Sequence, residues 1–179
     1  RCMSPRAVRG RMGMRSVSKA LSVMNTFNTS PNNLPLQVNR FIGRERELTA
    51  VSGLLMTTRL LTLAGAGGSG KTRLALQVAS DLLEEFEHGV WWVELAALSD
   101  PLLVPQAVAS ALGIPERADC TLTEALADAL RPKQLLLVLD NCEHLLAACA
   151  PFIETLLRTC FPLPVLVTRR EALTIRGGT

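Results

Sequence analysis

Short apolar runs alternate with amphipathic segments along most of the chain. Strand-like runs lie at residues 59–64, 90–95, 134–139 and 164–167, and the third run, QLLLVL, is apolar without alternation from its second residue to its last. A strand without a polar face is typical of a sheet that is covered on both sides. Segments with helical spacing separate the runs in the order βαβααβαβ. This order predicts an α/β fold in which a mostly parallel sheet lies between two helical layers.

Residue types at the predicted helix ends support this division. Asp100 and Pro101 have the types expected at the start of the first helix after residues 90–95, and Gly113 has the type expected at its end. Thr121 and Glu124 have the spacing of a capping box for the next helix. These signals predict two Ala- and Leu-rich helices between the second and third strands.

The first 32 residues lack this periodicity. They are rich in Arg, Ser, Met and Asn, and residues 1–40 contain seven Arg or Lys but no Asp or Glu. We interpret residues 1–32 as a flexible basic linker, with a transit peptide or a nucleic-acid-binding arm as alternatives. Residues 33–179 are expected to form one domain. The whole chain has 19 basic and 16 acidic residues. Since seven of the basic residues and none of the acidic ones lie in residues 1–40, the part beyond residue 40 is mildly acidic.

Composition limits the classes of function. Hydrophobic residues make up 48% of the 179, which is enough for a substantial core. The longest purely apolar run has about five residues, whereas a membrane span needs roughly twenty. Five Cys without a CxxC pair, together with 2 His, argue against a disulfide framework and a zinc site. We therefore expect a cytoplasmic protein that does not enter a membrane.

The strongest chemical signal is GAGGSGKT at residues 65–72, which matches G-x-x-x-x-G-K-[ST] between a strand and a helix. Its glycines allow successive backbone N–H groups to point at phosphate oxygens, and the helix that follows adds the positive end of its dipole. Lys71 supplies a positive charge for the β- and γ-phosphates, and Thr72 supplies a hydroxyl for Mg²⁺. The expected nucleotide-binding residues are Gly65, Ala66, Gly67, Gly68, Ser69, Gly70, Lys71, Thr72 and Arg73.

Polar residues also follow the third and fourth strands. Asp140 ends the third strand, where its carboxylate either holds Mg²⁺ with Thr72 or caps a helix that begins near Glu143. Arg170 follows the fourth strand, where it either contacts a γ-phosphate or is one of two surface arginines with Arg169. If Asp140 holds Mg²⁺ and Arg170 contacts the γ-phosphate, the candidate catalytic residues are Lys71, Asp140 and Arg170.

The residue after Asp140 affects the expected rate of hydrolysis. It is Asn141, whose amide cannot accept a proton as a general base. Glu143 is near in sequence, but the sequence does not show whether it reaches the site. Slow hydrolysis is therefore as compatible with these residues as rapid turnover.

Four segments in order resemble a known family. FIGRERE at 41–47, GAGGSGKT at 65–72, LLLVLDNCEHL at 135–145 and VLVTRREAL at 165–173 are together similar to the nucleotide-binding domain of STAND and NB-ARC signalling ATPases, which are related to AAA-type modules. The similarity is greatest to the ATPase modules of bacterial LuxR-like and SARP-like transcriptional regulators. It covers residues 33–179.

The resemblance implies a three-layer P-loop NTPase fold of the additional-strand kind. It also implies bound ATP or ADP with Mg²⁺, and a switch between autoinhibited and assembly-competent states. Residues 65–72 match the family's Walker A motif, and Asp140 matches its Walker B aspartate. Arg170 matches the sensor arginine, and Arg44 matches a position near the adenine and ribose.

The resemblance has consequences for partners and for completeness. It implies other domains of a longer protein, a nucleotide-dependent homo-oligomer, and DNA contact only through domains outside this segment. The family's T-S-R-E motif reads Thr168-Arg169-Arg170-Glu171 here, so a charged residue replaces Ser beside the sensor. The family's fifth strand would follow residue 179, so we expect a C-terminally truncated sheet.

Three functions are compatible with these residues. The first is an ATP/ADP-binding module that acts as a nucleotide-dependent switch, with slow Mg²⁺-dependent hydrolysis that would make it a weak ATPase. The second is a plain P-loop hydrolase or kinase, whose substrate lid is usually Arg-rich, whereas residues 101–131 contain only Arg117 and Arg131. The third is a non-hydrolysing nucleotide-binding scaffold, which Asn141 favours over a fast enzyme. The resemblance favours the first.

Overall fold

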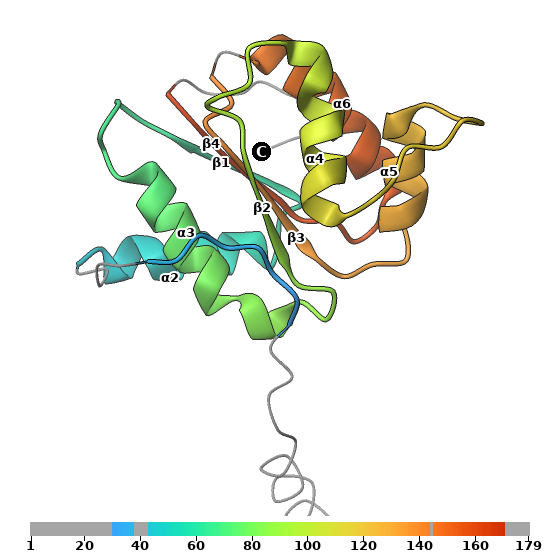
Figure 1. Ribbon diagram of the computed structural model, residues 1–179. Helices are drawn as coiled ribbons and strands as arrows, with labels where there is room; N and C mark the ends of the chain where they lie inside the picture. The colour runs from blue at the N-terminus through green and yellow to red at the C-terminus, as the bar shows by residue number, and fades with distance from the viewer. Residues whose placement is uncertain (1–29, 38–42, 144, 171–179) are drawn as a thin grey trace, which may run out of the picture.

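The computed structural model describes residues 30–37, 43–143 and 145–170. One sheet of four strands lies at its centre, in the order β1-β4-β3-β2, and every neighbouring pair is parallel (Figure 1). The strands are β1 (Leu60–Ala64), β2 (Val90–Glu94), β3 (Leu136–Asp140) and β4 (Val165–Arg169). The predicted α/β fold with a parallel sheet is confirmed.

Helices cover both faces of the sheet (Figure 1). On one face lie α2 (Glu45–Leu55) and α3 (Lys71–Asp81), followed by the 3-10 turn η1 (Leu83–Glu85). On the other face lie α4 (Val104–Leu112), α5 (Leu122–Leu130) and α6 (Leu146–Thr159), with the 3-10 turn η2 (Pro101–Leu103) before α4. The architecture is therefore the three-layer sandwich that the sequence predicts.

The two interior strands explain why the sheet needs two covering layers. All five residues of β3 and of β4 are buried. Along β3, Leu137 and Leu139 belong to the core beneath α4, α5 and α6, whereas Leu136 and Val138 belong to the core beneath α2 and α3. Because side chains alternate between the faces of a strand, an apolar residue at every position can be buried only in this way.

The predicted helix ends are confirmed with one difference. The Asp100 carboxylate accepts a hydrogen bond from the N–H of Leu102 at 2.9 Å, and the capping box of α5 is complete. However, the residues from Pro101 form a 3-10 turn, and α4 begins only at Val104. A continuous α-helix would need the N–H of Pro105 to reach the carbonyl of Pro101, and proline has no N–H.

The segment before α2 covers one edge of the sheet. The N–H of Val90 in β2 donates to the carbonyl of Pro31 at 3.2 Å. The side-chain amide of Asn33 bonds both backbone groups of Trp92, accepting from its N–H at 2.6 Å and donating to its carbonyl at 2.8 Å. At the opposite edge, β1 pairs with β4 alone among the described strands.

Gly89 lies where this segment approaches the sheet, so a larger residue at this position should lower the stability measurably. Its φ is +86°, and a Cβ at this position would lie 1.7 Å from the carbonyl oxygen of Pro31. We expect Gly89→Ala to lower the free energy of unfolding by about 2–3 kcal/mol, since it adds backbone strain and breaks the edge hydrogen bonds. Urea unfolding followed by circular dichroism measures this loss.

Gly113 provides the matched control for that variant. Its φ is +65°, but nothing lies within 4 Å of its Cβ position. Gly113→Ala should therefore lose only the backbone term, about 1 kcal/mol. Equal losses in the two variants would show that the contact with Pro31 contributes nothing.

A membrane-spanning helix needs about 20 predominantly apolar residues. Within the described residues, none of the helices is both long and apolar enough to cross a bilayer.

Candidate functional site

The loop that joins β1 to α3 carries the GAGGSGKT segment at the carboxyl edge of the sheet (Figure 1). Gly70 is the N-cap of α3 with φ 81° and ψ 21°, a left-handed conformation that residues with a Cβ adopt only at a cost. No side chain caps this helix, so its first N–H groups have no side-chain acceptor. Uncapped N–H groups at the positive end of a helix dipole form a ready site for an anion.

The ammonium group of Lys71 bridges this loop. Its Nζ donates to the carbonyl oxygens of Gly65 at 2.7 Å and Ala66 at 2.8 Å, and it lies 3.3 Å from Oγ of Ser69. The three donors of the ammonium are therefore matched by three acceptors of the loop itself. The positive charge lies inside the turn, where a phosphate group bound by the loop would meet it.

Thr72 and Asp140 come together beside the loop, although 68 residues separate them in sequence. Oγ1 of Thr72 donates to Oδ1 of Asp140 at 3.0 Å. The Asp140 side chain is almost fully buried, at 1% exposure, and it also accepts a hydrogen bond from Oγ1 of Thr168. The alternative in which Asp140 caps a helix near Glu143 is wrong, because α6 begins at Leu146.

The oxygen atoms of Thr72 and Asp140 fit a Mg²⁺ ion. Mg²⁺ prefers hydroxyl, carboxylate and phosphate oxygens in octahedral geometry, at about 2.0–2.1 Å from the metal. Two adjacent ligands of such an octahedron lie roughly 3 Å apart, and the observed separation is 3.0 Å. No group of three His, Cys, Asp or Glu that could hold a metal occurs in the described residues. A site that is completed by phosphate oxygens does not need one.

The backbone conformation at residue 141 suits Asn. Its φ is +60°, a left-handed conformation in which Asn is enriched among residues other than glycine. Its N–H donates to Oγ1 of Thr168 at 3.0 Å, and its side-chain amide donates to Oδ2 of Asp140 at 3.4 Å. Asn141 therefore helps to hold the Asp140 carboxylate, and a Glu at this position would be strained.

Arg170 and Glu143 meet above the loop. Nε of Arg170 lies 3.2 Å from Oε1 of Glu143, so Glu143 does reach the site. The guanidinium carbon of Arg170 lies 3.8 Å from the position that a Cβ on Gly67 would take. The alternative of two surface arginines is wrong for Arg169, which is buried at 2% exposure, whereas the Arg170 side chain is 68% exposed.

Arg44 approaches the other end of the loop. It is the N-cap of α2 with φ 62°, and its Nη1 lies 3.8 Å from the Cβ position of Gly70. The residues on either side of Arg44, Gly43 and Glu45, line an open cavity of about 590 Å³. The cavity lies between the 32–37 segment, α2 and α3, and its lining includes Leu34, Gly43, Glu45, Leu48, Gln77 and Ser80.

Residues 55–173 match the family described as "AAA domain". The chain belongs to this family of AAA domains. The expected resemblance to AAA-type ATPases is thereby confirmed.

Relatives of this AAA domain include bacterial proteins. It is 42% identical to the uncharacterized protein Rv0894 of Mycobacterium tuberculosis over 137 residues, which are 76% of this chain and 35% of that protein. It is 33% identical to the regulatory protein AfsR of Streptomyces griseus over 124 residues, covering 62% of this chain and 13% of that protein. The chain thus spans about a third or less of the length of these relatives.

A solved structure shares the fold. It is a Signal Transduction ATPase with Numerous Domains (STAND) protein from Pyrococcus horikoshii that has a tetratricopeptide repeat sensor. The TM-score is 0.52 at 18% identity, and the match covers 84% of this chain and 23% of that one. At this level of identity the likeness concerns the fold alone.

The AAA domain brings most of the predicted site residues to one place. Five of them lie at or beside the loop at residues 65–70: Lys71, Thr72, Asp140, Arg170 and Arg44. Arg73 is exposed in the first turn of α3. The functional role of each residue stays a prediction.

Two contacts of the site were not predicted from the sequence. Thr168 bonds Asp140, and Glu143 pairs with Arg170. The first could have been inferred, because Thr168 and Asp140 are polar residues at the ends of strands in one parallel sheet. The second depends on the path of the connection between β3 and α6, for which the sequence contains no periodic signal.

The thiol next to this site is inert. Cys142 is fully buried, and its hydrogen bond with Cys149, together with burial, raises the pKa of its thiol. Cys142 therefore stays neutral and adds no negative charge beside Asp140.

Proposed function

We propose that this AAA domain binds ATP and ADP and acts as a nucleotide-dependent switch in a signalling or transcriptional regulator, with slow Mg²⁺-dependent hydrolysis. The observation that carries the proposal is the convergence of four groups on one loop. These are the Lys71 ammonium, the Thr72–Asp140 oxygen pair, the Arg170 guanidinium and the uncapped start of α3.

Each group has a task that follows from its chemistry. Lys71 exchanges its bonds to Gly65 and Ala66 for bonds to phosphate oxygens. Thr72 and Asp140 hold Mg²⁺, which neutralises phosphate charge when it is bound. Arg170, above Gly67, contacts the γ-phosphate of ATP, which ADP lacks. Arg44 and the adjoining cavity accommodate the ribose and base.

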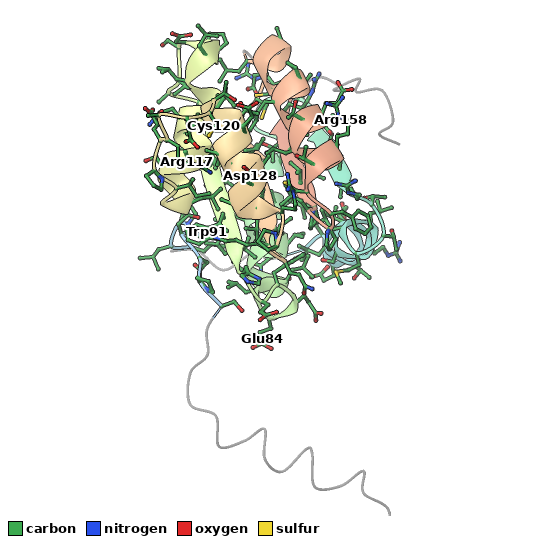
Figure 2. The ribbon with its side chains drawn as sticks, turned by 90° about the vertical axis from the view of Figure 1, so that its right-hand side faces the viewer. Glu84, Trp91, Arg117, Cys120, Asp128 and Arg158 are labelled. Carbon is green, nitrogen blue, oxygen red and sulfur yellow. The ribbon has the colours of Figure 1, made fainter. Side chains whose placement is uncertain are left out.

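The surface arginines argue against a plain kinase. Arg117 pairs with Asp119 at 2.6 Å, and Arg131 pairs with Asp128 at 3.1 Å. Figure 2 shows Arg117 and Asp128 in the helical layer that contains α4 and α5. Because both arginines are already paired with carboxylates of their own segment, they are poorly suited to hold an acceptor substrate. A non-hydrolysing scaffold is a second candidate. It is favoured by Asn141, which cannot act as a base and whose left-handed backbone conformation disfavours Glu. Measured ATP turnover separates it from a slow ATPase.

The relatives support a regulatory role. One of them is named as a regulatory protein, and a STAND protein shares the fold. We propose that this domain acts in the cytoplasm as part of a longer chain. In this proposal it forms a nucleotide-dependent homo-oligomer and contacts DNA only through other domains.

Removal of the Arg170 guanidinium tests the switch. We expect Arg170→Ala to lower the affinity for ATPγS about 10-fold, because a charge-assisted hydrogen bond to the γ-phosphate is lost, and to change ADP affinity less than about twofold. Isothermal titration calorimetry with Mg²⁺ measures both affinities. Arg158→Ala is the matched control, since Arg158 is exposed on α6 (Figure 2). Equal losses for the two nucleotides would remove Arg170 from the sensing role.

A further inference from the structure

The Glu143 carboxylate is only partly satisfied. Oε1 lies 3.2 Å from Nε of Arg170, whereas Oε2 is buried and has no hydrogen-bond partner among the described residues. A buried acceptor without a partner is destabilising and is rare in native proteins. Such an atom marks a place where a ligand or a water molecule completes the structure.

The position of this carboxylate links it to the phosphate loop. Glu143 pairs with Arg170, and the Arg170 guanidinium in turn lies against Gly67, 3.8 Å from the Cβ position of that residue. Glu143 follows Asp140 by three residues, in the connection between β3 and α6. The carboxylate is therefore one side chain away from the place where the loop would hold a γ-phosphate.

We infer that Glu143 is the catalytic base of ATP hydrolysis. Its ion pair with Arg170 keeps it inactive until a γ-phosphate binds Arg170 and releases the carboxylate. This inference rests on the function proposed above. In the step, the oxygen of a water molecule bonds to the γ-phosphorus as the bond from that phosphorus to the β,γ-bridging oxygen breaks. The electron pair of that bond stays on the β-phosphate of ADP, and the water proton passes to Glu143.

The energies of the competing contacts favour this exchange. The Arg170 side chain is 68% exposed and that of Glu143 is 26% exposed. An ion pair with so exposed a partner contributes little to stability. A γ-phosphate presents three acceptor oxygens and close to two negative charges, and hydrogen bonds to charged groups are stronger than those between neutral groups. The phosphate therefore outcompetes Glu143 for Arg170.

The residues near Glu143 are less suited than Glu143 to accept the proton of the attacking water. Asn141 cannot take a proton, and its left-handed backbone excludes an unstrained Glu at that position. The Asp140 carboxylate already accepts hydrogen bonds from Thr72 and Thr168. ADP lacks the phosphate that would release Arg170, so the base stays paired in the ADP-bound state.

Glu143→Gln tests both parts of the inference, because Gln keeps the shape of the side chain but loses its charge and basicity. We expect the single-turnover rate of ATP hydrolysis to fall at least about 100-fold. We also expect the affinity for ATPγS to rise about two- to fivefold, since Arg170 no longer has to leave a carboxylate, while ADP affinity stays constant. Equilibrium titration with ATPγS and ADP reports the second effect independently of turnover.

Two further variants make the result specific. Glu154→Gln removes an exposed carboxylate from α6 and should change none of these quantities. In the Arg170→Ala background, Glu143→Gln should no longer change the affinity for ATPγS, because the partner that it releases is absent.

The outcomes separate this inference from the proposed function. A Glu143→Gln protein that hydrolyses ATP at the wild-type rate overturns the inference, as does one with an unchanged ratio of ATPγS to ADP affinity. In both cases the proposed switch stands if the wild-type protein still discriminates the nucleotides through Arg170. A wild-type protein that binds neither nucleotide overturns the proposed function and the inference together.

Discussion

Lys71→Ala is expected to weaken binding of both ATP and ADP by at least about 100-fold, because the ammonium contributes charge-assisted hydrogen bonds of about 1.5–3 kcal/mol each to the phosphates. In the structure the three donors of Lys71 hold Gly65, Ala66 and Ser69, so the variant also loses the bridge that shapes the loop. Isothermal titration calorimetry with each nucleotide measures the loss. Ala is a strong helix former at the first position of α3, so the variant should fold.

Lys133→Ala is the matched control for this variant. Lys133 lies before β3, at the end of that strand opposite to Asp140, and it should leave both affinities unchanged. Unfolding curves of the two variants show whether either has lost stability. An ATP affinity in Lys71→Ala equal to that of the wild type, in a folded protein, would contradict the assignment of the loop.

Asp140→Ala is expected to have the second largest effect, and that effect should depend on Mg²⁺. Asp140 offers the only carboxylate that contacts Thr72 among the described residues. Its removal should lower the affinity for ATP about 10- to 100-fold with Mg²⁺ present, because one of the protein's ligands to the ion is lost, and by much less in EDTA. Parallel titrations with and without Mg²⁺ measure the difference.

The Asp140 variant needs a control for folding. Asp140 is buried, and Ala would leave the hydroxyls of Thr72 and Thr168 without this acceptor. Asp140→Asn keeps one carbonyl oxygen in place and removes the charge, so it separates loss of the ion from loss of the fold. Equal losses with and without Mg²⁺ in both variants would mean that Asp140 supports the structure and not the ion.

The fold was largely predictable because its signals are local. The apolar run of β3 has no polar face, and this pattern requires helices on both sides of the sheet. Thr121 and Glu124 form the predicted capping box, and Gly113 ends α4 in a left-handed conformation. Each of these features depends on the chemistry of neighbouring residues, which the sequence contains directly.

The predictions were less accurate where strands continue into polar residues. Asp140 was expected at the end of the third strand and does end β3, but the fourth strand was expected to end at residue 167, whereas β4 continues to Arg169. Asp140 is in register with Glu94, and Arg169 is in register with Ala64. Hydropathy ends a predicted strand at its first polar residue, whereas backbone pairing continues as long as the neighbouring strand does.

The site shows the same division between local and long-range information. The GAGGSGKT motif fixes its own backbone, so the position of Lys71 followed from the sequence. The left-handed conformation of Asn141 and the contact between Glu143 and Arg170 did not. Both depend on how the chain leaves β3 and β4, which no periodic pattern describes.

Calorimetric titration of the wild-type protein with ATPγS, in the presence and absence of Mg²⁺, tests the central claim most directly. The account predicts saturable binding at one site that Mg²⁺ strengthens and that ADP displaces. Absence of saturable binding to the folded protein in the presence of Mg²⁺ would contradict it.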